Sequence, residues 1–404
     1  MSKQTPVILF LASDFKGNEL IETCKELGCY TILLVREKKK GEAWAHHALD
    51  EFHAMPSIIR QPDITNAVSY LARSHDIDRI IALDDYDIET AAELREHLRL
   101  SGMGSSAARF FRDKLAMRVR AQEAGLPEPA FTPVFPHARL SEFVQRVPPP
   151  WVLKPRDEAG SQGIKKLHNA EEVWQTLEQL GDQQSHFHLE QYIPGKIDIF
   201  HIDSIVWHGE ILLSTVSEYG APPMVVAQGG GVFTTRLLDR NSADAKALTK
   251  LNKKLLKTMG MTSGINHAEF IKAHEAGGKF YFLEVAARVG GAHIGDMLEQ
   301  GTGINLWKER GKIEVAQARG EVYQLPEPRQ DYAGLIICLS KYEHPDLSAY
   351  NDPEIVWRLD RPFHAGMIVR SPVAERVKTL LDAYQERFAQ DFLTSVPLPE
   401  KGRV

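Results

Sequence analysis

The chain has 404 residues, 43% hydrophobic and 25% charged, which is enough for two to four packed domains and shows no bias toward disorder. Its net charge of −6 argues against the strongly basic surface that nucleic-acid binding normally requires. No apolar stretch reaches the ~20 residues of a membrane span, and the three cysteines lack paired spacing. We therefore expect a cytoplasmic protein with no nucleic-acid or membrane partner.

Residues 1–103 alternate between apolar strands and amphipathic helices. Strands are predicted at 6–12, 30–37 and 79–85, with helices at 18–28 and near 65–75. This order predicts an α/β domain built on a parallel βαβ sheet. The first turn, SDFKG, lacks the GxGxxG pattern, which disfavours dinucleotide binding. Asp84, Asp85 and Asp87 follow the third strand, where they would either contact a ligand or cap the next helix.

The next segment carries a possible phosphate site. One long helix over 108–125 and a proline-rich connector lead to the strand WVLKP, which contains Lys154. A loop with Gly160, Ser161 and Gly163 follows. Small loop residues let backbone N–H groups approach phosphate oxygens, and a lysine adds positive charge. An ordinary hairpin would use the same residues.

A strand over 186–193 contains Glu190, Gln191, Tyr192 and Ile193. Exposed main chain after such a strand can bind a flat heterocycle and recognise its edge through backbone hydrogen bonds. An ordinary strand and turn has the same pattern.

Two strands flank Gly277 and Gly278, which predicts a β-hairpin. If the turn centres between Ala276 and Gly277, Glu269 faces Glu284. Facing carboxylates destabilise a strand pair unless a cation lies between them, and their hard oxygens favour Mg²⁺ over zinc. The alternative is that one glutamate points to solvent.

Arg288 continues this strand, and its guanidinium could bind phosphate oxygens bidentately or form a salt bridge. Gly290 and Gly291 permit close approach of a substrate to the backbone, and His293 and Asp296 follow them. We predict that these four residues lie at the substrate.

Two further residues have open roles. Arg236, after a glycine-rich loop, could hold a carboxylate or a phosphate, or be a solvated loop arginine. His267 shares a strand face with Glu269, and we expect it to be a core or supporting histidine.

Taken in order, these motifs resemble the ATP-grasp superfamily, specifically carboxylate–amine ligases similar to bacterial L-amino acid ligases and carbamoyl-phosphate-synthase-like proteins. The resemblance covers residues 1–315. It implies an N-terminal parallel-sheet domain at 1–103, two lobes of an α+β ATP-grasp unit at 104–190 and 191–315, and a small C-terminal α/β subdomain at 316–404.

The resemblance also implies roles for individual residues. Lys114 in RDK and Lys154 would contact the nucleotide, the loop from Gly160 to Gly163 would cover the phosphates, and LEQYI would form the adenine hinge. Glu269 and Glu284 would bind Mg²⁺, with Mn²⁺ possible, while Arg288 would contact phosphate.

The sequence departs from the family in two places. Ala286 stands where many members have asparagine in the second metal strand, which weakens a second metal site. The ribose carboxylate usually lies two residues after the hinge glycine, but Asp198 is one place late and Asp203 is a rival.

The implied reaction is phosphorylation of a substrate carboxylate by ATP, followed by attack of an amine on the acyl phosphate to give an amide, ADP and phosphate. Lys154, Arg288 and Arg236 would be the catalytic residues, the substrates amino-acid-like, and a homodimer possible. The alternatives are a bicarbonate-activating carboxylase or carbamoyl-phosphate-type enzyme, and a non-catalytic ATP-binding regulator.

Overall fold

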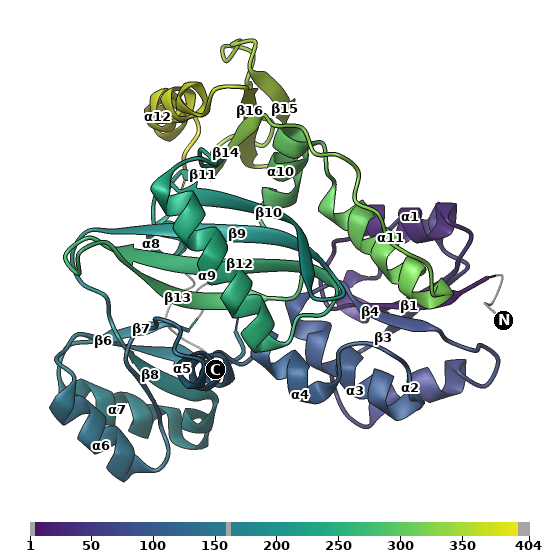
Figure 1. The fold of residues 1–404 in the computed structure, drawn as a ribbon, viewed down its shortest axis with the longest axis horizontal. Helices are drawn as coiled ribbons and strands as arrows, with labels where there is room; N and C mark the ends of the chain where they lie inside the picture. Colours follow the sequence, from purple (N-terminus) through teal and green to yellow (C-terminus); the bar gives the residue numbers. More distant parts are fainter. Residues whose placement is uncertain (1–4, 159–162, 395–404) are drawn as a thin grey trace.

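The computed structural model describes residues 5–158 and 163–394. Its strands form a four-stranded parallel sheet, an eight-stranded antiparallel sheet and a smaller four-stranded antiparallel sheet (Figure 1). This mixed architecture confirms the predicted fold class, an α/β domain joined to an α+β unit.

The N-terminal sheet has the order β3-β2-β1-β4, and all its neighbouring strands are parallel. The strands are β1 (Val7–Ala12), β2 (Tyr30–Arg36), β3 (Glu51–Met55) and β4 (Arg79–Ala82), and the helices are α1 (Asn18–Glu26), α2 (Asp63–Leu71) and α3 (Ile88–Leu98). The sequence analysis missed β3, because EFHAM has no continuous apolar run.

The predicted single helix over 108–125 is wrong. The structure has α4 (Ser105–Ala108), a 3₁₀ turn and then α5 (Lys114–Glu123). The break lies at Asp113, whose carboxylate accepts hydrogen bonds from the N–H groups of Leu115 and Ala116 and so caps α5. The cap makes Lys114 the first residue of α5.

The small sheet has the order β5-β8-β6-β7 and carries the predicted strand with Lys154. Its elements are β5 (Phe131–Pro133), α6 (His137–Arg146), β6 (Trp151–Pro155), β7 (Lys165–Leu167), α7 (Ala170–Leu180) and β8 (Phe187–Gln191). Leu140, Phe143, Val173 and Leu177 of the two helices form one apolar cluster with Trp151, Leu153 and Leu189 of the sheet.

The large sheet has the order β13-β12-β9-β10-β11-β14-β16-β15. Its elements in chain order are β9 (Ile197–Trp207), β10 (Glu210–Tyr219), α8 (Pro223–Gly229), β11 (Phe233–Leu237), α9 (Ala243–Met259), β12 (Gly264–Ala273), β13 (Lys279–Ala286), α10 (Ile294–Thr302), α11 (Leu306–Arg319), β14 (Tyr332–Leu339), β15 (Ile355–Arg358), β16 (His364–Ser371) and α12 (Ala374–Asp391).

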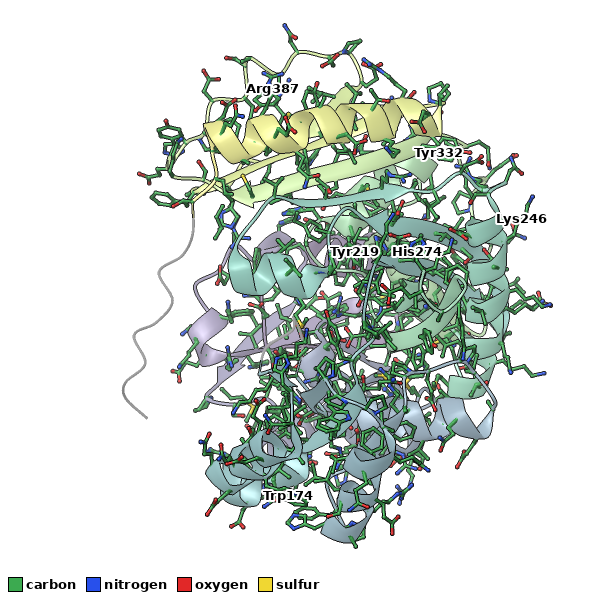
Figure 2. The ribbon with its side chains drawn as sticks, turned by 90° about the vertical axis from the view of Figure 1, so that its left-hand side faces the viewer. Trp174, Tyr219, Lys246, His274, Tyr332 and Arg387 are labelled. Atoms are coloured by element: carbon green, nitrogen blue, oxygen red, sulfur yellow. The ribbon has the colours of Figure 1, made fainter. Side chains whose placement is uncertain are left out.

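The C-terminal strands extend this large sheet, because β14 pairs with β11. The expected C-terminal subdomain therefore forms no separate sheet within the described residues, and the domain limits themselves stay a prediction. Figure 2 shows α12, with Arg387, at the opposite end of the molecule from Trp174 of the small lobe.

Helices cover both faces of the large sheet. On one face, Leu248, Leu255 and Leu256 of α9 pack with Phe200 and Phe270 of the strands. On the other, α10 and α11 contribute to the largest apolar cluster, and α11 also packs against α1. No helix in the described part of the chain combines the length and apolarity needed to cross a bilayer.

Candidate nucleotide and metal site

A cavity of about 390 Å³ opens between the small sheet and one face of the large sheet. The small sheet contributes Val152 and Lys154, and the large sheet contributes Ile199 and Ile271. Eight of the residues predicted for nucleotide and metal binding line this one cavity: Lys114, Lys154, Glu190, Gln191, Tyr192, Ile193, Glu269 and Glu284.

The hairpin pairing is as predicted, since Glu269 lies opposite Glu284. Nearer the turn the register is one residue off the prediction, with Ala273 opposite Lys279, and an irregularity after Glu269 restores it. This β-bulge leaves Leu283 and Glu284 both lining the cavity, although neighbouring strand residues normally face opposite sides.

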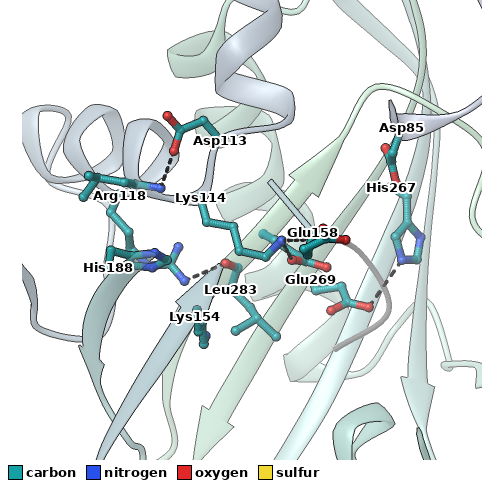
Figure 3. Close-up of polar contacts among 12 residues, drawn as sticks. Asp85, Asp113, Lys114, Arg118, Lys154, Glu158, His188, His267, Glu269 and Leu283 are labelled. Atoms are coloured by element: carbon teal, nitrogen blue, oxygen red, sulfur yellow. Dashed lines mark hydrogen bonds and ion pairs between the residues drawn. The ribbon is translucent and has the colours of Figure 1, made fainter. Parts of the chain in front are cut away.

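Lys114 contacts both Glu284 on β13 and Glu158, which precedes the glycine loop. Its Nζ lies 3.2 Å from the Glu284 carboxylate and donates to the Glu158 carbonyl at 2.6 Å (Figure 3). Burial by itself raises the pKa of Glu284, but the positive charges of Lys114, Lys154 and Arg288 together outweigh it, so the pKa lies below its ordinary value. Glu284 is therefore an anion prepared to bind a cation.

Glu190 holds Lys154 in place. The Glu190 side chain is 1% exposed, and its oxygens lie 2.7 Å from Lys154 Nζ, Arg118 Nε and His188 Nε2. Burial opposes its ionisation, but the Arg118 and Lys154 charges hold the pKa of Glu190 well below its usual value. The Glu190 side chain is thus occupied by Arg118 and Lys154 and is not free to contact an adenine base.

Arg118 was not predicted, although a signal existed. It follows Lys114 by four residues, which places both side chains on one face of α5. From that face Arg118 also donates to the Leu283 carbonyl at 2.7 Å, tying α5 to the metal strand.

Glu269 belongs to a buried polar chain on the cavity face of the sheet. Its Oε1 accepts from Tyr219 Oη at 2.7 Å and lies 3.4 Å from His267 Nε2. His267 Nδ1 lies 2.9 Å from Asp203, which also binds His201 Nδ1 at 2.7 Å. His267 is therefore the supporting residue that we expected.

The prediction that Asp203 binds ribose is wrong. Asp203 is 1% exposed and lies between His201 and His267, so no ligand hydroxyl can reach it. Burial opposes the charged form of His267, yet Asp203 raises the pKa of His267 to about 10. The three side chains are close enough to hold a metal, but both carboxylate oxygens already bind a histidine ring.

Asp198 and Arg236 face away from the nucleotide cavity. Ile197 and Ile199 line that cavity, so Asp198 between them points to the other face of β9, where its carboxylate binds His274 at 2.6 Å. Arg236 pairs with Glu218. Asp198 and Arg236 instead border a separate cavity of about 190 Å³, which contradicts the ribose role of Asp198 and a role of Arg236 at the phosphates.

Arg288 contacts the N-terminal domain. Its Nε lies 2.5 Å from Asp85, and its Nη1 donates to the Val289 carbonyl at 2.8 Å. Asp84 caps the turn after β4 by accepting from the Tyr86 N–H, and Asp87 binds Ser13. The structure thus brings Arg288 to Asp85 rather than into the lining of the cavity.

Of the predicted substrate residues, Gly290, Gly291 and His293 lie in the turn before α10, and Asp296 lies in the helix itself. Ala292 and His293 both have a left-handed backbone, with φ of 50° and 61°, which non-glycine residues rarely adopt. His293 Nδ1 lies 2.9 Å from Asp296. A Cβ atom at Gly290 would lie 3.0 Å from His267 Nδ1, a tight contact that favours glycine there. Gly291 has open space around it.

Of the glycine loop, Gly160 and Ser161 lie outside the described residues. Gly163 has φ of 68°, and a Cβ atom there would lie 2.8 Å from Pro155 Cγ. Glycine is therefore required where the loop rejoins β7.

The residues present fit one hard divalent cation. Glu269 and Glu284 offer facing carboxylates at the cavity, and no cysteine takes part in the site. Ala286 lies opposite His267 and supplies no oxygen ligand, so a second metal ion lacks the side chain that many ATP-grasp proteins provide.

Comparison with known proteins identifies one distant relative by sequence. The chain is 27% identical over 245 residues to an L-arginine-specific L-amino acid ligase from Bacillus subtilis, a match that covers 59% of this chain and 58% of that protein. The chain thus spans less than two thirds of this relative. No protein-family model matches.

Solved structures share the fold over nearly the whole chain. An L-amino acid ligase from Bacillus licheniformis superposes with a TM-score of 0.71 at 16% identity, covering 98% of this chain and 100% of that one. The biotin carboxylase domain of a Hydrogenobacter thermophilus 2-oxoglutarate carboxylase, solved with MgADP and bicarbonate, gives 0.69 at 17% identity, with 97% and 91% covered. The chain therefore shares its fold with these enzymes and is similar in sequence to an L-amino acid ligase.

Proposed function

We propose that the protein is an ATP-dependent ligase that joins an amino-acid-like carboxylate to an amine, with release of ADP and phosphate. The observation that supports this most directly is the convergence of two lysines, the predicted hinge and two facing carboxylates on one cavity. The fold alone does not separate ligases from carboxylases, because neighbours of both kinds superpose well. Similarity to an amino acid ligase favours amino acids.

The chain's own residues would bind and orient ATP. The hinge from Gln191 to Ile193 would hold the adenine, and Lys154, fixed by Glu190, would reach the phosphates. Lys114 would pass from Glu284 to a phosphate oxygen when nucleotide is bound. Glu269 and Glu284 would hold Mg²⁺, or Mn²⁺ in its place, and this ion supplies positive charge beside the phosphate oxygens.

In the proposed reaction a carboxylate oxygen attacks the γ-phosphorus, and the bond from that phosphorus to ADP breaks. The amine nitrogen then attacks the acyl carbon, phosphate leaves with the electrons of the C–O bond, and the nitrogen loses a proton. Arg288, which pairs with Asp85 outside the lining of the cavity, would have to turn from Asp85 toward the transferring phosphoryl group to stabilise it. We assign Arg236 no part in this transfer, because it borders the other cavity.

Phosphate release by the purified protein tests this proposal. With Mg-ATP and pools of amino acids, we expect phosphate and a matching amide, detected by mass spectrometry, only when both a carboxylate and an amine are present. Glu284→Gln should abolish turnover, whereas Glu178→Gln, at an exposed position on α7, should not. Release that needs bicarbonate would indicate a carboxylase, and tight ATP binding with no release in any pool would indicate a regulator.

A further inference from the structure

A further cavity lined by charged residues lies where the N-terminal domain meets α11 and the start of β12. It measures about 60 Å³, several times the ~10–15 Å³ that one water molecule occupies. Its walls include Arg79 from β4, Arg95 from α3 and Arg310 from α11. Glu314 is the one carboxylate among its lining residues, so positive charge exceeds negative charge.

The three guanidinium groups are unequally satisfied. Arg79 binds Glu314, with its Nη2 2.5 Å from the carboxylate, and Arg95 donates to the carbonyls of Ile80 and Met103 at 2.7 and 3.0 Å. Arg310 is 7% exposed, and its buried Nη1 has no hydrogen-bond partner in the described part of the chain. A buried charged donor without a partner is costly, which points to a missing acceptor.

The charges of the three arginines also favour a bound anion. Burial is the main cause that lowers the pKa of Arg95 to about 10, and the nearby charges of Arg79 and Arg310 lower it further against the opposing effect of Glu314. Burial likewise lowers the pKa of Arg310, although Glu314 and Asp85 oppose it. An anion among these groups would relieve both the repulsion and the desolvation.

We propose that this cavity binds a small inorganic oxyanion, with phosphate as the probe. Arg310 supplies the unpartnered donor, and a guanidinium matches the oxygens of phosphate well. Ser263 lines the same cavity, and its Oγ accepts from the His208 N–H, so its own hydroxyl hydrogen is available to the anion. Arg79 already donates to Glu314, Ser101 and Gln317, so Arg310 and the Ser263 hydroxyl supply the hydrogen bonds while Arg79 and Arg95 add positive charge.

The anion site adjoins the proposed active site without sharing its residues. Ala287 lines the cavity and directly precedes Arg288. Asp85, which binds Arg288, is also close enough to Arg310 to raise its pKa. An anion that draws Arg310 toward itself would therefore alter the charge around the Asp85–Arg288 pair.

Thermal unfolding of the full-length protein tests the site. Phosphate titrated at constant ionic strength, with gluconate as the balancing anion, should raise the Tm as the logarithm of 1 + [phosphate]/Kd, by roughly 2 °C at ten times its Kd. Arg310→Met should lose this rise. Lys154→Met and the exposed Arg139→Met should keep it, because neither residue lines the cavity.

A gain-of-charge variant keeps the test decisive if Arg310→Met folds poorly. Thr262 lies at the exposed rim of the cavity, so Thr262→Glu should raise the Tm without phosphate and shrink the phosphate effect. The proposal is overturned if phosphate gives no rise in Tm, if Arg310→Met responds like the wild type, or if Lys154→Met alone loses the response. These readouts need no turnover, so they stand or fall separately from the ligase proposal.

Discussion

Glu190→Gln should destabilise the protein strongly, because this side chain neutralises a buried cluster of cations. The carboxylate is 1% exposed and contacts Arg118, Lys154 and His188, each at 2.7 Å. The glutamine keeps the shape but leaves Arg118 buried without a counter-charge. Removing one partner of a buried ion pair typically costs about 3–5 kcal/mol, and we expect a loss of that order in the free energy of unfolding at pH 7.

The difference in unfolding free energy between wild type and Glu190→Gln should depend on pH. The pKa of Glu190 in the folded protein lies well below its ordinary value, so its stabilisation is fully present above the unfolded pKa of about 4.3. The stabilisation is lost as the pH falls from there toward the folded pKa. Urea unfolding at several pH values should therefore show wild type and variant differing at pH 7 and converging in acid.

The matched control is Glu178→Gln, which changes an exposed glutamate in the same lobe and should shift the midpoint little. Equal urea midpoints for wild type and Glu190→Gln at pH 7, with equal m-values, would refute the reasoning. A difference that does not shrink in acid would show that the effect is steric rather than electrostatic.

Three further predictions follow from the site. Asp203→Asn weakens the hydrogen bonds that orient His267 beside Glu269. The Mg²⁺ concentration for half-maximal turnover should therefore rise about 10-fold. A change under about twofold would contradict this role of Asp203. Asp113→Ala removes the cap of α5 and should lower the free energy of unfolding by about 1 kcal/mol in denaturant titrations; an unchanged midpoint would refute it. Burial raises the pKa of Glu128 to about 8, so its ionisation destabilises the fold as the pH rises from about 4.3 toward that value. Glu128→Gln should accordingly be more stable than the wild type at pH 8 and match it near pH 4, and equal stability at both pH values would argue against this assignment.

Local patterns predicted the centre of the site well. Strand alternation and the glycine pair predicted Glu269 opposite Glu284, but the register at the turn would place Leu283 there, and a bulge restores the predicted pair. The bulge that adjusts the register gave no sequence signal. The predicted pair forms although the register near the turn is shifted by one residue from the prediction.

Contacts between segments that are distant in the sequence could not be predicted from it. Arg288 and Asp85 are 203 positions apart, and nothing in either segment indicates that a parallel sheet and a metal strand meet there. The same applies to β14, whose pairing with β11 joins the C-terminal segment to the large sheet. Such contacts depend on the packing of whole domains rather than on local pattern.

The ribose prediction failed for a reason that the sequence contained. In IDIFHID, strict alternation places Asp198 on the opposite face from Ile197 and Ile199, and places His201 and Asp203 on the same face as each other. A histidine and an aspartate two apart in a buried strand are typical of an internal hydrogen-bonded pair, which is what the structure shows.

The central claim is that a substrate carboxylate is phosphorylated at the cavity between Lys154 and the facing glutamates. Isotope transfer tests it most directly. The amino acid whose carboxylate is to be phosphorylated is labelled with ¹⁸O at both carboxylate oxygens and turned over with Mg-ATP and an amine. The released phosphate is then analysed by mass spectrometry. Passage through an acyl phosphate predicts one ¹⁸O atom in each phosphate released. Unlabelled phosphate, formed while ATP is consumed and the amide appears, would contradict the account.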